Sequence, residues 1–315
     1  MQISGYPEVL VSDCIRQTEE ASDSYMHRRI KPYIRQNEKE KTRLFTVIAR
    51  GIKDRSKMRE IIDFHVHPFL DKSELTCFYK QSMEFEEDFF KKDLTEAGIT
   101  KICGSVIRFD GMSEQDGFDS IRKLNRDALS LKEKWGEFYI PGVHVHPSFV
   151  RESCEELEHM SRQGVKLVGE LVPYLHGWSD YSSKALGEIL DVIGQLKMVV
   201  SYHSMDDEQM DIMIKNHPKV TFVAAHPGDR NTYGFHLERL KKYSNAYLDL
   251  SGTGLFRYGM LKHGVDIVGA EKFLFGTDYP ITNPHMYVQA VEFEKIREED
   301  KDLIFYKNAK RLLAL

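Results

Sequence analysis

Several apolar segments of this chain end in residue types that bind divalent metal ions. The sequence His-x-His-Pro occurs twice, in DFHVHP at 63–68 and in GVHVHP at 142–147. Further candidates stand at or near the ends of other apolar segments: Glu170, His203, His226 and Asp278. Imidazole and carboxylate groups suit zinc or a similar divalent ion, and a catalytic zinc site keeps one position open for water. The residues therefore predict a metal centre that activates water.

The apolar segments predict the elements that position these residues. They are rich in Val, Ile, Phe and Tyr and nearly continuous in apolarity, as expected of strands buried on both faces. Their ranges are 60–68, 99–107, 138–147, 164–173, 197–204, 219–228, 246–254 and 272–280. Charged stretches with helical periodicity separate them, such as DSIRKLNRDALSLKEKWG at 119–136. This alternation predicts an α/β fold with right-handed βαβ units and a parallel sheet.

The count and the length favour a (β/α)8 TIM barrel over residues 59–315. A doubly wound open sheet is the alternative, but the Gly-rich phosphate loop expected after its first strand is missing from the sequence. Catalytic groups of a barrel gather at the C-terminal ends of its strands. Side chains alternate along a strand, so His65 and His67 are expected to point to the same side and to bind one ion together. A single His or Asp at a strand end is usually structural, but five such strand ends on one face predict a site.

Residues 1–58 fall outside this pattern and predict an N-terminal helical extension. From Met26 to Arg59 the chain has twelve Lys or Arg and three Asp or Glu, whereas the whole chain has a net charge of −5. A solvated helical surface is the expected explanation, and a homo-oligomer contact or a polyanion-binding arm is the alternative. Few aromatic residues interleave with these charges, so nucleic acid is not an expected partner.

The composition predicts a reduced, cytoplasmic protein. The four cysteines are scattered without CxxC spacing, which argues against a disulfide framework or a cysteine-based metal site. The sequence also lacks an apolar stretch of membrane-spanning length, and its N-terminus does not show the basic-then-apolar pattern of a signal peptide. A membrane is therefore not an expected partner.

The order of the candidate residues resembles the amidohydrolase superfamily of metal-dependent hydrolases, in particular the amidohydrolase-related branch that also contains decarboxylases. The resemblance covers residues 60–315. It rests on four motifs: DFHVHP, SYHS at 201–204, AAHPG at 224–228 and FGTDYP at 275–280. The ending YKNAKRLL at 306–313, with Asn308, Ala309 and Arg311, is similar to the closing helix of that branch.

The resemblance implies roles for the candidate residues. The ligands that it implies are His65, His67, His203 and Asp278. It implies that His226 is either a ligand of a second ion or an acid/base beside a single ion. Glu170 would be a ligand or a bridge at the mouth of the barrel, while Lys166 lies deeper and is expected to be an ordinary barrel residue. The Gly-Glu pair is also similar to the fourth-strand motif of TatD-type nucleases. One or two divalent ions are implied, and Zn²⁺ is the expected ion.

The second His-x-His pair has a different expected role. The 65/67 pair follows Asp63 on the first strand and fits the starting motif of the family, so it is the expected metal pair. His146 is expected to border the substrate pocket or to donate a hydrogen bond to the metal site. A histidine held by the local backbone is the alternative. A separate metal site at His144 and His146 is not expected because a carboxylate that would complete it is lacking.

The expected reaction is hydrolysis of a small, anionic ester, lactone, amide or phosphoester. Asp278 would accept the proton of the water and return it to the leaving group, while His226 or His203 stabilises the developing oxyanion. Residues expected in loops that could bind the substrate are Arg108, Tyr174, His176, Arg230 and Arg257, and the arginines would pair with an anionic group.

Three alternatives stay open. A non-oxidative decarboxylase of an aromatic acid could use the same scaffold, with His226 or Asp278 delivering the proton. A TatD-like nuclease could use the basic segment, and a catalytically inactive barrel could serve as a scaffold. Two ions bridged by Glu170 would favour the hydrolase, and one ion beside a free His226 would favour the decarboxylase.

Overall fold

The computed structural model describes residues 59–82 and 88–315. Eight strands form one sheet in the order β1 to β8, and every pair is parallel. The strands are β1 Ile62–Asp63, β2 Lys101–Ser105, β3 Tyr139–Val143, β4 Leu167–Leu171, β5 Val199–His203, β6 Thr221–Ala225, β7 Ala246–Asp249 and β8 Phe273–Leu274. The predicted eight-stranded TIM barrel is thereby confirmed.

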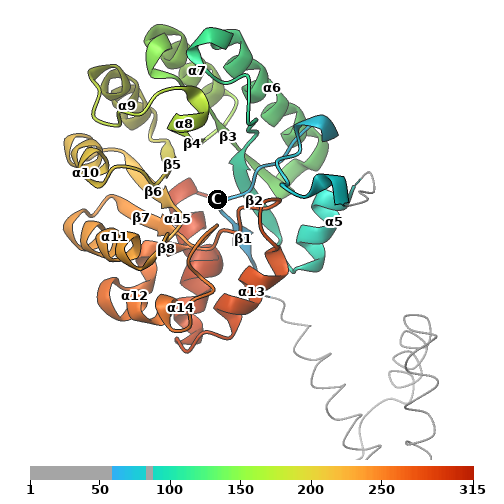
Figure 1. The fold of residues 1–315 in the computed structure, drawn as a ribbon, viewed down its shortest axis with the longest axis vertical. Helices are drawn as coiled ribbons and strands as arrows, with labels where there is room; N and C mark the ends of the chain where they lie inside the picture. Colours follow the sequence, from blue (N-terminus) through green and yellow to red (C-terminus); the bar gives the residue numbers. More distant parts are fainter. Residues whose placement is uncertain (1–58, 83–87) are drawn as a thin grey trace, which may run out of the picture. The chain divides into compact units, whose positions relative to one another are not determined.

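Helices surround the strands in a ring (Figure 1). They are α5 Phe89–Glu96, α6 Phe118–Trp135, α7 Val150–Arg162, α8 Pro173–His176, α9 Lys184–Leu196, α10 Asp207–Asn216, α11 Arg230–Lys242, α12 Met260–Val268, α13 Pro284–Glu292, α14 Glu298–Asp302 and α15 Asn308–Leu313. Among the shorter elements, η5 Pro147–Phe149 is a 3₁₀ turn and Leu303–Lys307 is one turn of π-helix. The predicted N-terminal extension and its basic segment up to Met58 lie outside the described residues.

Backbone hydrogen bonds between the first and last strand segments complete the barrel. The N–H of Phe64 donates to the carbonyl of Phe275 at 2.8 Å, and the N–H of His67 donates to the carbonyl of Tyr279 at 2.8 Å. In the other direction, the N–H of Asp278 donates to the carbonyl of His65 at 2.7 Å. The closure therefore brings the DFHVHP and FGTDYP motifs side by side.

The buried carboxylate of Asp63 reinforces this closure. It accepts hydrogen bonds from the N–H of Thr277 at 3.0 Å, from its hydroxyl at 2.6 Å and from the N–H of His65 at 3.1 Å. Burial raises the pKa of Asp63 to about 7, and the hydrogen bonds from Thr277 and His65 limit that rise. One side chain of β1 thus holds the chain segments that carry His65 and Asp278.

Helix α15 packs on apolar residues inside the barrel. Ala309 and Leu313 belong to a buried cluster with Ile62, Phe64, Cys103, Leu167, Val199, Val223 and Leu274, and these seven come from six strands and the residue after β1. A larger cluster fills the space between the strands and the surrounding helices. Figure 1 shows α15 and the C-terminus within the ring of helices. The apolar residues of this closing helix thus contribute to the core of the barrel.

All eight strands are shorter than the predicted segments, and in two of them the side-chain alternation shifts. In the first, Ile62 and Phe64 lie in the inner cluster, while Val66 lies in the outer one. In β4, the pairing with β5 shifts register between Val168 and Leu171. Both shifts occur immediately before a candidate ligand, and they turn the polar side chains at the strand ends toward the barrel axis.

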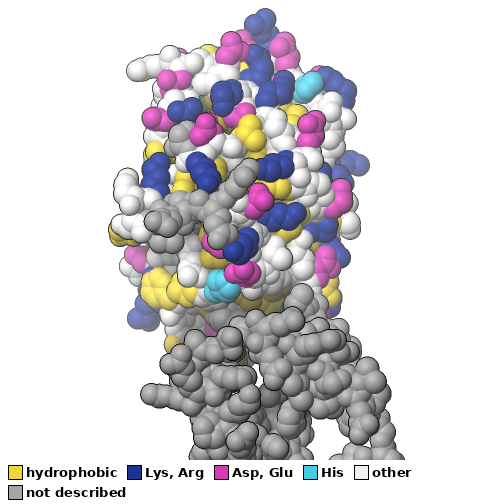
Figure 2. Space-filling model, turned by 90° about the vertical axis from the view of Figure 1, so that its right-hand side faces the viewer, with side chains coloured by type: hydrophobic (Ala, Val, Ile, Leu, Met, Phe, Trp, Pro, Cys, Tyr) yellow, Lys and Arg dark blue, Asp and Glu magenta, His cyan; other side chains and the backbone are white. Residues whose placement is uncertain are grey.

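The outer surface carries interspersed charges. Figure 2 shows acidic and basic side chains intermixed with small apolar areas on the face that lies at the right of Figure 1. Arg59, the last residue of the basic segment, forms ion pairs with Glu292 at 2.7 Å, with Asp302 at 3.0 Å and with Glu298. Within the described residues, none of the helices combines the length and the apolar character that crossing a bilayer requires.

We expect Asp63→Ala to lower the free energy of unfolding by about 3 kcal/mol, because three buried donors would lose their acceptor. Urea unfolding of the metal-free protein measures this change. Asp266→Ala is the control, since Asp266 pairs with Lys262 on the exposed side of α12, and its effect should stay within about 0.5 kcal/mol. An equal, small effect of both substitutions would contradict the role of Asp63 in barrel closure.

Candidate metal centre

Three predicted ligands meet where the first and eighth strand segments lie side by side. His65 Nε2 and His67 Nε2 are 3.1 Å apart. An oxygen of Asp278 lies 3.3 Å from His67 Nε2 and 3.6 Å from His65 Nε2. All three residues are buried. These donor atoms converge on one point and form a group that could hold a metal ion.

Glu170, at the end of β4, lies between these residues and the remaining two histidines. One carboxylate oxygen is 3.4 Å from His65 Nε2 and 3.5 Å from His67 Nε2. The other oxygen is 2.8 Å from His203 Nδ1 and 3.6 Å from His226 Nε2. The structure therefore brings together all six residues that were expected to be ligands.

A glycine makes the inward position of Glu170 sterically feasible. Gly169 has a φ of +94°, which residues with a side chain rarely adopt. A Cβ at this position would lie 2.1 Å from the carbonyl oxygen of Ser201 and 2.5 Å from the N atom of Leu171. The Gly-Glu pair of the sequence thus combines a backbone requirement with an acidic ligand candidate.

Asp249, which sequence reasoning missed, orients two of the histidines. One of its oxygens lies 2.9 Å from His65 Nδ1. Its other oxygen accepts the hydroxyl proton of Ser251, and the same hydroxyl oxygen lies 3.0 Å from His226 Nδ1. Since the Ser251 proton is used on Asp249, the hydroxyl oxygen must accept from His226. Both rings therefore carry a proton on Nδ1 and turn Nε2 toward Glu170.

The donor set fits a divalent cation. His67 Nδ1 lies 3.4 Å from the carbonyl of Ser105, so its Nε2 is also available to a ligand. The neutral forms of His65 and His67 would place two lone pairs face to face at 3.1 Å. Such an arrangement is stable only with positive charge between the nitrogens, either a proton or a metal ion. Buried imidazoles with adjacent carboxylates are the ligands that Zn²⁺ and Mn²⁺ accept.

The pKa shifts of His65 and Glu170 show that the metal-free site also combines a positive charge with ionised carboxylates. Burial acts to lower the pKa of His65, but the carboxylates of Asp249 and Glu170 outweigh it and raise that pKa well above its usual value. Burial acts to raise the pKa of Glu170, but His65 and hydrogen bonds from His203 and His67 hold it well below its usual range. The site therefore favours ionised carboxylates next to a positive charge, and a divalent ion would replace the proton.

The position of His226 depends on a glycine of the SGTG sequence. A Cβ at Gly252 would lie 2.3 Å from His226 Nδ1, and Gly252 has a φ of +60°. Burial lowers the pKa of His226 below its usual value, which favours the neutral ring. Gly252 therefore leaves space for the imidazole of His226.

The second His-x-His pair forms its hydrogen bonds with backbone groups. His146 Nε2 donates to the carbonyl of His176 at 2.8 Å, and its Nδ1 accepts from the N–H of Ser148 at 3.1 Å. His144 Nε2 donates to the carbonyl of Val106 at 2.8 Å. His146 thus makes the contacts expected of a histidine that the local backbone holds, and its side chain caps η5. His176 is fully buried, and its ring nitrogens have no hydrogen-bond partner within the described residues.

Tyr174 is the candidate substrate residue that contacts the six-residue group. It lies in α8, is 59% exposed and stands edge-on to the ring of His203 with 5.2 Å between centroids. Arg230 is exposed at the start of α11. Arg257 donates to the carbonyl of Gly228 at 2.6 Å. Arg257 therefore ties together the loops after β6 and β7, while a role of either arginine in substrate binding stays a prediction.

A comparison with protein families assigns most of the chain to one family. Residues 62–315 match the family described as Amidohydrolase. None of the curated proteins matches the chain in sequence. The family match covers all eight strands and all six predicted ligands, and it agrees with the resemblance carried by the motifs.

Three solved structures with the same fold are aromatic acid decarboxylases. A 2,6-dihydroxybenzoate decarboxylase solved with 2,6-dihydroxybenzoate is 15% identical, with a TM-score of 0.66 over 82% of this chain and 100% of that chain. A dihydroxybenzoic acid decarboxylase from Polaromonas sp., solved with manganese and 2-nitroresorcinol, is 15% identical, with a TM-score of 0.61 over 82% and 97%. A 5-carboxyvanillate decarboxylase from Novosphingobium aromaticivorans, solved with manganese and 4-hydroxy-3-methoxy-5-nitrobenzoic acid, is 12% identical, with a TM-score of 0.61 over 82% and 97%. At these identities the likeness shows a shared fold.

We expect Asp249→Ala to weaken divalent metal binding by about 10- to 100-fold, because His65 and His226 would lose the partner that directs Nε2 inward. Competition with a chromogenic chelator measures the dissociation constant for Mn²⁺ or Zn²⁺. Asp191→Ala, on the exposed face of α9, is the control and should bind metal like the wild type. Unchanged affinity in Asp249→Ala would contradict the orienting role.

Proposed function

This chain belongs to the amidohydrolase family, and we propose that it is a divalent-metal-dependent decarboxylase of a small aromatic acid. The proposal differs from the hydrolase expected first and takes up the alternative of non-oxidative decarboxylation. It is supported by the number of ion positions that the donor atoms allow and by the reactions of proteins with the same fold.

The observation that carries the proposal is the sharing of His65 by the two possible donor groups within the described residues. One group is His65, His67 and Asp278, and the other is His65, Glu170 and His226. His65 Nδ1 is occupied by Asp249, so only the single lone pair of Nε2 is available. Because one lone pair binds one ion, the two groups cannot be filled together. One ion on the first group leaves His226 free, which is the arrangement expected of a decarboxylase.

A bound divalent ion would hold an oxygen of the substrate and withdraw electron density from the reacting bond. Decarboxylation breaks the bond between the ring carbon and the carboxylate carbon, releases CO₂ and places one proton on the ring carbon. His226 is suited to carry that proton, because its neutral Nε2 faces the centre. It would take a proton from a hydroxyl group of the bound substrate and return it to the ring carbon.

The aromatic character of the substrate is inferred from the proteins with the same fold. Related structures contain dihydroxybenzoate or nitro-substituted phenols, and two contain manganese. In this chain the exposed ring of Tyr174 beside His203 offers a surface on which an aromatic substrate could stack. Mn²⁺ is therefore the first ion to test, ahead of the Zn²⁺ expected from the sequence.

We expect the Mn²⁺-loaded protein to convert 2,6-dihydroxybenzoate or 5-carboxyvanillate, with one CO₂ released for each acid consumed. His226→Asn should lower kcat by about 100-fold or more while bound metal is retained, because a proton carrier is lost. Substrate absorbance and CO₂ release measure the reaction, and His217→Asn, next to Asp191 on the surface, is the matched control. Failure to decarboxylate any hydroxybenzoate in a panel, or full activity of His226→Asn, would contradict the proposal.

Hydrolysis remains a second candidate because of one specific contact pattern. Glu170 lies within 3.6 Å of four imidazole nitrogens, those of His65, His67, His203 and His226. A carboxylate in that position could bridge two ions after a small rearrangement of the rings. Two ions for each chain, loss of one ion in Glu170→Gln, and turnover of lactones, esters or phosphoesters would favour this candidate. The TatD-like nuclease alternative took the basic segment as its nucleic-acid contact, and nearly all of that segment lies outside the described residues.

A further inference from the structure

His203 and His226 lie at the ends of two neighbouring strands, so their positions depend on how these strand ends are held. β5 ends at His203, and the ladder between β5 and β6 pairs His203 with Ala225, the residue before His226. The rings of His203 and His226 are 4.9 Å apart at 71°. Their side chains are 26% and 16% exposed, which makes them the least enclosed of the six candidate ligands. Packing alone therefore constrains these two rings less than the others.

The side chain of Ser204 connects β5 to β6 beyond the last residue pair of their ladder. Ser204 follows His203, and its hydroxyl donates to the carbonyl of Ala225 at 2.6 Å. The hydroxyl oxygen lies 3.0 Å from His236 Nε2. A serine has one hydroxyl proton, which is used on Ala225, so Ser204 must accept from His236. The segment after β5 is thus joined to the residue that precedes His226.

An arginine determines the tautomer of His236. The guanidinium of Arg239 lies 3.1 Å from His236 Nδ1. Arginine can only donate, so Nδ1 accepts and the proton of His236 lies on Nε2, facing Ser204. His236 and Arg239 are 1% and 4% exposed. Burial, with a contribution from Arg239, lowers the pKa of His236 to about 3, so the ring is neutral and keeps this single proton.

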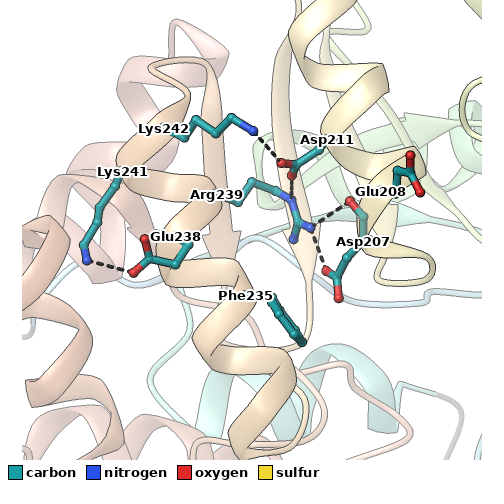
Figure 3. Close-up of a pocket in the computed structure, with 8 residues that line it drawn as sticks. All are labelled: Asp207, Glu208, Asp211, Phe235, Glu238, Arg239, Lys241 and Lys242. Carbon is teal, nitrogen blue, oxygen red and sulfur yellow. Dashed lines mark hydrogen bonds and ion pairs between the residues drawn. The ribbon is translucent and has the colours of Figure 1, made fainter.

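Two carboxylates of the preceding helix hold Arg239 in turn. Its Nε donates to Asp211 at 2.8 Å, and one terminal nitrogen donates to the carboxylate of Asp207 at 2.7 Å. Figure 3 shows these bonds at the outer end of the network, where Arg239 of α11 reaches Asp207 and Asp211 of α10 beside a surface hollow. The helices that follow β5 and β6 are therefore linked to each other and to the ends of both strands.

We infer that Ser204, His236 and Arg239 are positioning residues for His203 and His226. The hydrogen bonds run from the carboxylates of α10 through these three residues to the carbonyl of Ala225. At each step, the donor and the acceptor follow from the preceding hydrogen bond. A change at any link leaves a buried donor or acceptor without its partner and loosens the two strand ends. The inference deepens the proposed function and rests on it where metal binding is concerned, but the effect on the backbone does not require a metal.

The variants are chosen to separate positioning from general stability. Ser204→Ala removes the link between the strand ends. His236→Leu removes both bonds of the ring, whereas His236→Gln keeps an oxygen that can accept from Arg239 and an amide that can donate to Ser204. Leu190→Ala in α9 is the control, because Leu190 is buried in the core and outside this network. Leu190→Ala should lower the melting temperature without affecting the metal centre.

The first readout is hydrogen exchange of the metal-free, full-length protein. Amides in residues 203–206 and 225–229 should exchange about tenfold faster in Ser204→Ala and His236→Leu, because a lost hydrogen bond makes local opening easier. His236→Gln should exchange at nearly the wild-type rate, and Leu190→Ala should not change these segments selectively. Unchanged exchange in both disruptive variants, or an equal change in Leu190→Ala, would overturn the inference.

The second readout is a Co²⁺ titration followed by visible absorption. Ser204→Ala and His236→Leu should bind Co²⁺ about tenfold more weakly and with an altered spectrum, and His236→Gln should resemble the wild type. Wild-type affinity and spectrum in all variants would overturn a role at the metal centre. A wild-type protein that binds no Co²⁺ would contradict the proposed function instead, and the exchange rates would then decide the positioning role.

Discussion

The buried carboxylate of Asp249 determines which nitrogen two imidazoles turn toward the centre. It lies 2.9 Å from His65 Nδ1 and, through the hydroxyl of Ser251, controls the proton on His226 Nδ1. The two rings follow β1 and β6, yet both turn Nε2 inward because a single side chain of β7 holds them. A neutral ring with its proton on Nε2 could not bind a metal ion through that nitrogen. The chemistry of the site therefore depends on a residue that does not itself face the centre.

This orientation also prevents the two donor groups that contain His65 from being filled at the same time. With Nδ1 of His65 used on Asp249, the remaining lone pair is shared between two donor groups. Filling the group with His67 and Asp278 leaves Glu170 and His226 beside the ion, without the nitrogen that His65 would add to them. The reaction class then follows from what the free groups can do, and a neutral imidazole next to the ion is suited to moving a proton. The barrel itself would serve hydrolysis equally well.

Much of the fold and the set of donor residues could be predicted from the sequence. Eight apolar segments separated by helical patterns indicated the barrel, and His65, His67, Glu170, His203, His226 and Asp278 were found because they end those segments. The structure brings these six together. Strand-end position was informative because parallel strands in a barrel all end on the same face.

Other features depend on neighbours that sequence spacing does not reveal. Asp249 ends β7 in the structure but lies in the middle of the apolar segment 246–254, and its partner His65 is 184 residues away in the sequence. The inward turn of Glu170 needs the register shift at Gly169, which regular alternation does not anticipate. His146 was expected either to border the substrate pocket or to be held by the local backbone, and the ring nitrogens bond to a backbone carbonyl and to the N–H of Ser148. Hydrogen bonds of this kind become visible only in the folded chain.

The most direct test of one oriented ion position is anomalous diffraction from crystals of the Mn²⁺-loaded protein. We expect one manganese peak for each chain, bonded to Nε2 of His65, Nε2 of His67 and the carboxylate of Asp278. Nδ1 of His65 should stay on Asp249. Two peaks bridged by Glu170 would contradict the single position and return hydrolysis to first place. The lack of any peak at these residues would contradict the metal centre itself.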